Sequence, residues 1–505
     1  MSPAKSEKQT HAKDRAVEIA NTFEWLITAF ILAFVFRAFI MEAYRIPTGS
    51  MADTLRGAHF RLRCLQCGYK YRYGLGNYGL PQDTMPAGPL RKKNTRCPSC
   101  GYYQSTGGNM AVSNGDRILV LKCIYQFFKP KRWDVVVFKN PLEPQINFIK
   151  RLVALPGETV EIIDGDIYIN GRISRKPRAL QEQLWMPVYD NDYQPVQPRQ
   201  GLFNGHFWKQ PFDVENSKWV VDDLNPTMFR LDSPGEETQS LVYDSTVGND
   251  FRAAYAYDDM ITYKYMPHCS DLMMRFYARF AEPAGSIGIA LSKYQTRYKG
   301  RFDSSGRMTI VAVSQDKETL LAERYPGTPF PVNKPVPVQF SNVDHQLTFR
   351  VGDEKLTCDL GLLPEDAGPR ETDIGPQAEI FGSGKMTLSH VAVFRDIYYI
   401  SSMFPNGGKG GRAGEGNPFA LADDEFFMLG DNSPNSHDGR WWSQPGIGNN
   451  SRQYRTGIVP REYLVGKALF VYWPGGFKPT AGFPFAVVPN VGQMRFIYGG
   501  SRDIQ

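Results

Sequence analysis

The chain has 505 residues, of which 42% are hydrophobic and 22% are charged, and its formal net charge is +6. This is an ordinary globular composition, at a length that suggests two or three domains. Lysine and arginine form no continuous basic stripe, so we expect no nucleic-acid partner.

An apolar run close to the N-terminus is the first strong signal. Residues 25–36 (WLITAFILAFVF) carry no charge, and the run resumes after Arg37 and continues to Met41. This is about the minimum length of a transmembrane helix. We therefore predict a tail over 1–21 and a membrane anchor over 22–41. A cleaved signal peptide and a buried core helix are the alternatives, and the sequence EAYRIPTGS that follows offers no good signal-peptide cleavage site.

The orientation of this anchor is not decided by charge. Arginine and lysine occur on both sides of the apolar run. The positive-inside rule therefore does not fix which side of the membrane the rest of the chain occupies.

Two pairs of cysteines follow the anchor, in CLQCGY and CPSCGY. In each C-x-x-C pair both sulfurs can bind one metal ion, and two pairs complete a tetrahedral zinc site. We predict a zinc-ribbon-like module over 61–108 with one structural zinc, held by Cys64, Cys67, Cys97 and Cys100. Two disulfides are the alternative, because an extracytoplasmic location would permit them.

Short β-branched runs dominate the next region. Strands are predicted within 116–122, 134–139, 147–155 and 159–172, and DGDIYINGR in the last of them indicates a hairpin that ends at Asn170-Gly171.

A second β-rich region extends over about 177–403, and we predict it to be an inserted domain. Its alternating runs at 285–292, 308–316, 335–351 and 385–400 favour an all-β sandwich. The closing segment, GSGKMTLSHVAVFRDIYY, is similar in pattern to the last strands of concanavalin-like jelly-roll sandwiches. A glycine-rich stretch over 404–417 then predicts a flexible linker. Sequence patterns typical of strands occur again in 418–505.

A possible nucleophile lies in YRIPTGSM, at Ser50. A serine hydroxyl needs a base to take its proton, and lysine can be that base when its pKa is lowered. Lys150, in NFIKRLVAL, would share a strand face with Phe148, where burial could lower its pKa by roughly two units. The alternatives are an ordinary turn at Ser50 and a solvated strand end at Lys150.

A different catalytic arrangement is suggested by His437 beside Asp438, which would form a Ser-His-Asp triad with Ser50. No G-x-S-x-G sequence surrounds Ser50, so we favour the lysine.

Five motifs occur in order along the chain: IPTGSM with a following TL, GDRILV, WDVVVFKNP, FIKRLVALPGETV and GDNSPNSHDGR. Together they resemble the type I signal peptidase family of membrane-anchored Ser-Lys proteases. The resemblance covers about 150 residues, in the pieces 44–60, 113–175 and 425–475. It implies a catalytic domain built from 42–60, 109–176 and 418–505, the last with a C-terminal tail.

The resemblance also implies roles for individual residues. Ser50 is the expected nucleophile and Lys150 its general base, while the Thr48 hydroxyl would complete the oxyanion hole. Ser436 would orient the lysine amine, with Asp438 and Arg440 as a supporting pair. Four apolar residues would line the shallow subsites for the small side chains of the cleavage site: Ile46, Met51, Leu55 and Ile149.

The chain departs from the family pattern at several positions. Asp53 replaces a usual proline, and Asn147 replaces an aspartate that could pair with Arg440. Ser433-Pro434 and Gly439 also differ from the usual residues. None of these changes affects Ser50 or Lys150.

The expected fold is mainly β: a transmembrane helix followed by a signal-peptidase-type domain, interrupted by the zinc-ribbon-like module and the sandwich. The expected function is removal of signal peptides from exported preproteins, with no cofactor for catalysis. The protein would span the plasma membrane once with its catalytic domain extracytoplasmic, and its partners would be preprotein signal peptides, lipid and the export machinery. The alternative is a membrane-tethered binding protein that uses the sandwich on an inactive scaffold.

Overall fold

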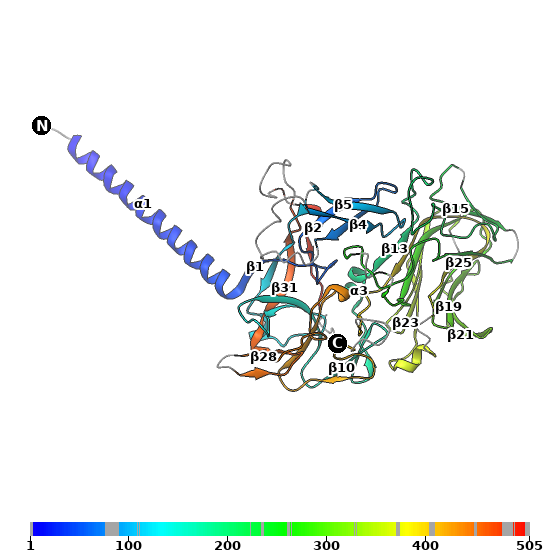
Figure 1. The fold of residues 1–505 in the computed structure, drawn as a ribbon. Coiled ribbons are helices and arrows are strands. Elements are labelled where there is room, and N and C mark those ends of the chain that lie inside the picture. The colour runs from blue at the N-terminus through cyan, green and yellow to red at the C-terminus, as the bar shows by residue number, and fades with distance from the viewer. Residues whose placement is uncertain are drawn as a thin grey trace.

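The computed structural model describes residues 4–75, 90–108, 110, 112–222, 224–233, 237–259, 263, 265–327, 329, 331–369, 374–402, 410–448, 452–476, 488 and 490–499. A long N-terminal helix projects from a body made almost entirely of β-sheets (Figure 1). The mainly β fold with one apolar N-terminal helix agrees with the sequence prediction.

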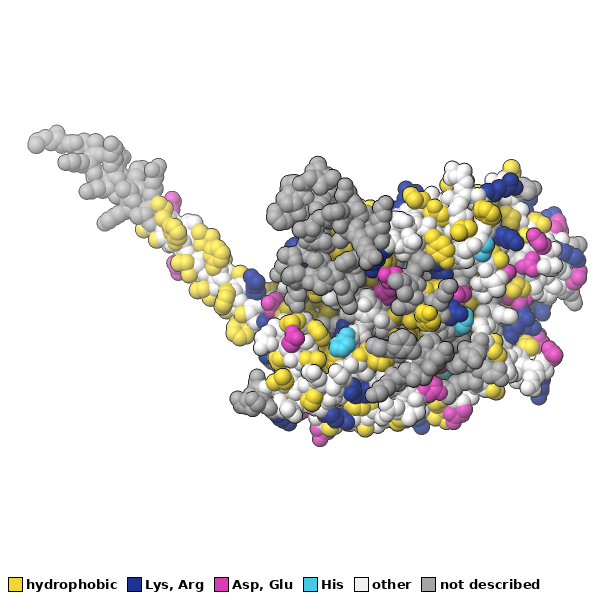
Figure 2. Space-filling view, in the orientation of Figure 1, with side chains coloured by type: hydrophobic (Ala, Val, Ile, Leu, Met, Phe, Trp, Pro, Cys, Tyr) yellow, Lys and Arg dark blue, Asp and Glu magenta, His cyan; other side chains and the backbone are white. Residues whose placement is uncertain are grey.

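The projecting helix is α1 (Ala4–Val35), which continues into the π-helical turn η1 (Phe36–Ile40). Within the described part of the chain it is the one helix long and apolar enough to cross a membrane, over Val17–Ile40. Its apolar side chains are exposed in the isolated chain (Figure 2). The predicted anchor, 22–41, lies almost entirely within it, and the helix extends further into the predicted tail than expected.

An eight-stranded sheet begins directly after this helix, in the strand order β1-β7-β31-β8-β9-β27-β30 with β32 beside β31. Alternating or fully apolar runs such as VVVF in β8 bury side chains in the cores on its faces. The bounds are β1 (Met41–Arg45), β7 (Arg117–Leu121), β8 (Val135–Lys139), β9 (Asn147–Ala154), β27 (Glu425–Leu429), β30 (Val459–Pro460), β31 (Leu464–Trp473) and β32 (Arg495–Phe496).

A four-stranded sheet contains the predicted hairpin. Its strands are β10 (Thr159–Ile163), β11 (Asp166–Ile169), β12 (Arg172–Ile173) and β26 (Phe419–Ala420). Both turns place two residues at positive φ, Asp164-Gly165 and Asn170-Gly171. Such turns match the twist of paired strands, and the hairpin prediction is confirmed.

The cysteine-containing region forms two small sheets above the eight-stranded sheet in Figure 1. One contains β2 (His59–Arg63), β3 (Lys70–Gly74) and β6 (Val112–Ser113), and the other pairs β4 (Leu90–Arg96) with β5 (Tyr103–Gly108). Residues 76–89 of the predicted module lie outside the described part of the chain.

The largest sheet is centred on one long strand, β25 (Ala378–Arg395). Residues 378–383 of β25 pair with β18, and residues 386–395 pair with β17. The two halves pack face to face, because a Cβ at Gly300 on β19 would lie 2.8 Å from the ring of Phe349 on β23. The further strands are β13 (Met186–Asp190), β14 (Trp219–Val221), β15 (Phe229–Ser233), β16 (Gln239–Val242), β17 (Leu272–Phe280), β18 (Ser286–Lys293), β19 (Thr296–Asp303), β20 (Met308–Ser314), β21 (Lys317–Arg324), β22 (Val336–Val343), β23 (Gln346–Val351) and β24 (Glu354–Asp359).

Short elements complete the chain. They are α2 (Ile124–Phe127), α3 (Arg178–Leu184), the 3₁₀ helices η3 (Pro364–Ala367), η4 (Ser433–Asn435), η6 (Arg461–Tyr463) and η7 (Val491–Gln493), and the pair β28 (Gly446–Ile447) and β29 (Gln453–Tyr454).

Buried ion pairs join the four-stranded sheet to the large one. Lys293, at the end of β18, lies 2.5 Å from Asp271 and 3.6 Å from Asp166 of β11. Lys176, after β12, pairs with Asp344 and lies 2.9 Å from Asp396. Two lysines thus neutralise part of a four-aspartate cluster at this seam, and removing one partner of such a buried pair is strongly destabilising.

The stretch predicted as a flexible linker, 404–417, behaves differently in its described part. Residues 404–409 lie outside the described residues. Ala413 is buried and its carbonyl accepts a hydrogen bond from the amide of Ile162, while Arg412 donates to the carbonyls of Gly439 and Trp442. For 410–417 the linker prediction is therefore wrong, because glycines here allow close packing rather than chain freedom.

Candidate active site

The segment that carries Ser50 leaves β1 and turns back over the eight-stranded sheet. The amide of Ile46 donates to Asp116, and the amide of Leu55 donates to Met51. Ile46, Met51 and Leu55 are buried in the core with the inner residues of β7 and β8. These three anchors fix the turn between them and leave Ser50 partly exposed.

Lys150 comes from the middle of β9, opposite Val136 of β8. Its Nζ lies 2.5 Å from the Oγ of Ser50, in a hydrogen bond that joins residues one hundred positions apart. The lysine is buried, and its Nζ lies 5.8 Å from the centre of the Phe148 ring. Phe148 and Lys150 therefore share a strand face, as period-two alternation predicts.

The electrostatic surroundings of Lys150 favour its neutral form. The pKa of Lys150 is lowered from 10.5 to about 8, chiefly by burial and also by the positive charge of Arg440. The negative charges of Asp438 and Asp431 act in the opposite direction. A neutral amine within hydrogen-bond distance of a serine hydroxyl can accept its proton.

A buried loop after β27 stands behind this pair. Asp438 accepts hydrogen bonds from the amide of Gly430 and from Arg440, whose guanidinium also donates to Ser433 and to the carbonyl of Ile400. Although burial acts to raise it, the charge and hydrogen bonds of Arg440 lower the pKa of Asp438. Arg440 thus has partners without the aspartate that Asn147 replaces.

Ser436 and Thr48 lie near the pair without bonding to it. A Cβ at Gly430 would lie 2.2 Å from the Ser436 Oγ and 2.5 Å from the Ser50 carbonyl oxygen, which places Ser436 beside the nucleophile's peptide. Among the residues described, no hydrogen-bond partner of the Ser436 Oγ is found. Thr48 is exposed. Their expected roles remain predictions.

The four residues predicted to line apolar subsites differ in exposure. Ile46, Met51 and Leu55 are fully buried, whereas Ile149 on β9 is partly exposed. Ile149 is thus the one of the four that presents surface beside Lys150 without any rearrangement. Asp53, at the position of a usual proline, lies 3.3 Å from Arg56.

His437 does not join this arrangement. Its side chain is exposed, whereas Asp438 beside it points into the buried loop towards Arg440. The geometry therefore brings a lysine, not a histidine, to Ser50.

Two contacts near the site were not predicted from the sequence. Arg151 donates two hydrogen bonds of 2.7 Å to Asp431, and both side chains are buried. The amide of Asn432 donates to the carbonyl of Ser50 at 3.0 Å. Alternation along β9 could have indicated that Arg151 points away from Lys150, but nothing in the sequence identifies its distant partner.

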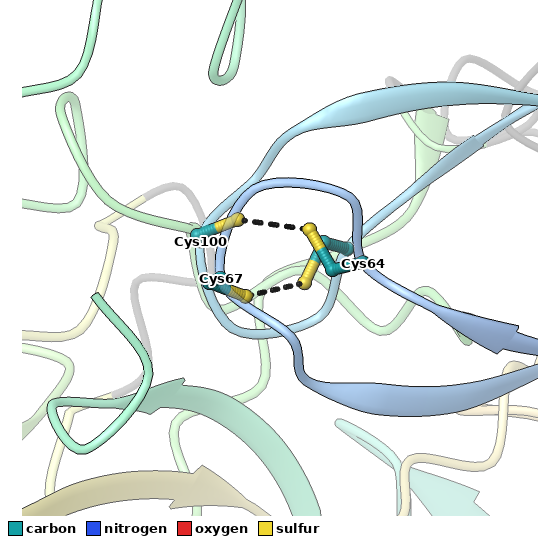
Figure 3. A group of neighbouring side chains, drawn as sticks. Cys64, Cys67 and Cys100 are labelled. Atoms are coloured by element: carbon teal, nitrogen blue, oxygen red, sulfur yellow. Dashed lines mark hydrogen bonds between the residues drawn. The ribbon is translucent and has the colours of Figure 1, made fainter. Parts of the chain in front are cut away.

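The four paired cysteines converge at one point, and Figure 3 labels three of them, Cys64, Cys67 and Cys100. The Sγ atoms of Cys64 and Cys100 are 3.6 Å apart and those of Cys67 and Cys97 are 3.7 Å apart, and all four lie within 4.8 Å of one another. Tetrahedral zinc with ~2.3 Å bonds to sulfur requires spacings of about 3.8 Å. No disulfide joins the described cysteines, and the donor set fits a zinc ion.

The two cysteine turns have the same backbone geometry. The amide of Gly68 donates to the carbonyl of Cys64, and that of Gly101 donates to Cys97, each at 3.0 Å. Both glycines have φ near +75°, where a side chain would be strained. The repeated Cys-x-x-Cys-Gly sequence therefore encodes two matching knuckles.

Comparisons with known proteins match parts of the chain only. The family described as "Signal peptidase, peptidase S26" matches residues 99–218 and 404–473, which include Lys150 and Ser436 but not Ser50. The signal peptidase I of Rickettsia canadensis (strain McKiel) is 30% identical over 151 residues, which are 30% of this chain and 43% of that protein. That of Rickettsia prowazekii (strain Madrid E) is 31% identical over 141 residues, 28% of this chain and 39% of that protein.

The chain thus spans about two fifths of the length of these relatives. Among solved structures, a carbohydrate-binding module CBM66 from Bacillus subtilis covers 37% of this chain and 96% of its own, at 9% identity and a TM-score of 0.24. A score this low carries neither fold nor ligand to this chain. The matched segments, which include Lys150, are thus similar to the signal peptidase family, peptidase S26.

Proposed function

We propose that this protein is a type I signal peptidase, a serine endopeptidase that removes signal peptides from exported preproteins. The observation that carries the proposal is the 2.5 Å contact between the Lys150 amine and the Ser50 hydroxyl, with the lysine buried. The family match and the signal peptidase I relatives support the same activity.

The reaction would begin with transfer of the Ser50 hydroxyl proton to the neutral amine of Lys150. The Ser50 Oγ attacks the carbonyl carbon of the peptide bond to be cleaved, which produces a tetrahedral oxyanion. The protonated lysine then gives its proton to the leaving amine, and an acyl-enzyme on Ser50 remains. Water, deprotonated by the same lysine, hydrolyses this ester and frees the signal peptide.

The oxyanion needs donors that are fixed before the reaction. The backbone N–H of Ser50 and the hydroxyl of Thr48 are our candidates, and the exposure of Thr48 leaves its hydroxyl free to turn towards a bound substrate. Ser436 would orient the lysine, and the buried Asp438–Arg440 pair would hold the loop that carries it. Ile149 would contact the small residues before the cleavage site, and the buried Ile46, Met51 and Leu55, against whose cluster it packs, would do so only after a rearrangement.

The membrane anchor would serve the reaction by placing the site at the lipid surface. β1 begins at Met41, directly after the apolar segment, and Ser50 follows β1. A signal peptide lies in the same membrane, so anchoring raises the effective concentration of both partners. We assign the anchor to the plasma membrane, the catalytic domain to its extracytoplasmic side, and preproteins leaving the export machinery as substrates.

Zinc at the cysteine cluster would be structural. Cys64, Cys67, Cys97 and Cys100 supply four thiolates, which leave no open coordination position for catalysis. The sulfur spacings and the two matching knuckles support this assignment. The metal would join β2 and β3 to β4 and β5 beside the catalytic sheet.

The test of function is cleavage of a model preprotein by the detergent-solubilised enzyme. Ser50→Ala and Lys150→Ala should each abolish cleavage, because one removes the attacking atom and the other the base. His437→Ala is the matched control, since it changes an exposed neighbour of the same loop, and it should retain most activity.

Two results would contradict the proposal. Equal loss in His437→Ala and Ser50→Ala would restore a histidine base. A wild-type enzyme that cuts no preprotein, at any pH from 6 to 10, would favour the binding-protein alternative.

A further inference from the structure

The segment 253–258 (AAYAYD) belongs by sequence to the region predicted as the sandwich insert, yet it lies against the candidate active site. Tyr257 is buried, and a Cβ at Gly49 would lie 2.3 Å from its ring. The same ring lies 2.2 Å from a Cβ built at Gly74 of β3, whose amide donates to the Tyr257 carbonyl. The ring thus fills the space between the residue before the nucleophile and the cysteine module.

Asp258, the last residue of this segment, binds the loop behind Ser50. Its Oδ1 accepts hydrogen bonds from the side-chain amides of Asn432, at 2.8 Å, and Asn435, at 3.1 Å. Tyr255 adds a third bond, from its hydroxyl to the carbonyl of Asp431, the residue that pairs with Arg151. The segment therefore binds three residues of the loop behind Ser50: Asp431, Asn432 and Asn435.

Asn432 continues the connection to the nucleophile. It is fully buried, and its side-chain amide donates to Gly49 at 3.2 Å while its backbone amide donates to Ser50 at 3.0 Å. Asp258 fixes the direction in which this side-chain amide points. Two hydrogen bonds thus separate the carboxylate of Asp258 from the peptide units on either side of Ser50.

We propose that Asp258 is a positioning residue for Ser50, through which the inserted region holds the nucleophile in register with Lys150. This rests on the proposed function, since a nucleophile must act for its position to matter. An error of about 1 Å in the placement of a reacting group costs on the order of a hundredfold in rate. Removing one of several anchors should cost less, about tenfold in kcat.

The chemistry of Asp258 determines which substitutions separate position from charge. Its Oδ2 has no hydrogen-bond partner among the described residues, and burial raises the pKa of the carboxyl to about 7. A neutral group with one accepting oxygen can therefore replace it. Asp258→Asn retains that oxygen, Asp258→Ala removes it, and Asp258→Glu keeps the charge but displaces it by one methylene.

The experiment measures kcat and KM for preprotein cleavage in these three variants of the full-length protein. We expect kcat to fall about tenfold in Asp258→Ala and to fall in Asp258→Glu, with KM within twofold of the wild type and the pH midpoint unchanged. Asp258→Asn should recover most of kcat. Asp259→Ala is the matched control: Asp259 forms an ion pair with Lys93 of β4, and its loss should leave kcat unchanged.

Hydrogen exchange provides a readout independent of activity. Loss of the anchor should speed exchange at the amides of Ala52 and Asn432, which are bonded to Gly49 and Ser50, while amides of β17 and β25 remain protected. This measurement decides whether Asp258 anchors the Ser50 segment even if the wild type cleaves no preprotein, and that result would overturn the proposed function without changing the exchange result. Wild-type kcat and exchange in Asp258→Ala, or an equal loss in Asp259→Ala, would overturn the positioning role.

Discussion

Lys150 must be both buried and within reach of Ser50 to act as a base. An exposed lysine has a pKa of ~10.4 and is almost fully protonated at neutral pH. Burial shifts the equilibrium towards the neutral amine, and the carboxylates of Asp438 and Asp431 moderate the shift. Arg440 and Arg151 each bind one of these aspartates, so the carboxylates are partly neutralised before they act on the lysine.

The pH dependence of cleavage follows from this balance. Because the pKa of Lys150 is lowered to about 8, the fraction of neutral amine rises as pH increases through 8. We expect kcat/KM, which reports the free enzyme, to rise with pH and reach half its maximum near pH 8. The measurement is initial rates from pH 6 to 9.5, with circular dichroism as a control for folding. A profile that is flat, or that falls over this range, would exclude a titrating lysine base.

Sequence reasoning at this scale succeeded where periodicity carries the information. Phe148 and Lys150 share a face because β9 is a regular strand, and their ring-to-amine distance agrees with that. The bonds that Arg151 donates to Asp431 and that Asn432 donates to Asp258 connect positions 280 and 174 residues apart. No local pattern predicts such partners, because the fold alone brings them together.

At the level of secondary-structure elements, the two cysteine turns show how one short sequence, repeated, builds the two halves of one site. Each knuckle needs a glycine at positive φ directly after its second cysteine, and the chain provides Gly68 and Gly101. The strands that follow, β3 and β5, start from the same position in each knuckle. The ligand geometry is therefore local and was predictable, whereas the contacts of this module with Tyr257 were not.

Metal analysis tests the zinc assignment at this scale. Purified wild-type protein should contain about one zinc per chain, and Cys97→Ser should lose it, because three remaining thiolates bind zinc much less tightly than four. Cys358→Ser is a matched control, since Cys358 lies on β24 away from the cluster, and should retain the metal. A metal-free wild type without titratable thiols at the four positions would establish disulfides instead.

At the level of the whole molecule, the region 177–403 packs directly against the rest of the β-rich body and is not joined to it through its two ends alone. Lys176 and Lys293 join buried aspartates from both sides of the seam, and the described part of the glycine-rich stretch packs against the active-site loop. The sequence indicated the two β-rich regions through their alternation. It could not indicate their interface, because buried charges resemble surface charges until their partners are known.

The orientation of the molecule in the membrane is the remaining prediction at this scale. The 24-residue apolar segment reaches roughly 36 Å as a helix, enough for a hydrocarbon core of ~30 Å. The amide of Lys122 donates to the carbonyl of Ile40, and the exposed Phe127 and Phe128 follow nearby, so we expect the eight-stranded sheet to begin at the lipid surface. If the protein cleaves emerging preproteins, as we propose, this surface would be extracytoplasmic.

Protease added to intact cells stripped of any outer envelope should therefore remove an epitope fused after Gln505. The epitope should be digested without lysis, because we expect every residue beyond Met41 to lie outside the cytoplasm. A cytoplasmic marker protein, intact in the same sample, controls for leakage. Survival of the epitope until lysis would show the opposite orientation. The charge distribution does not exclude that orientation, since basic residues flank the segment on both sides.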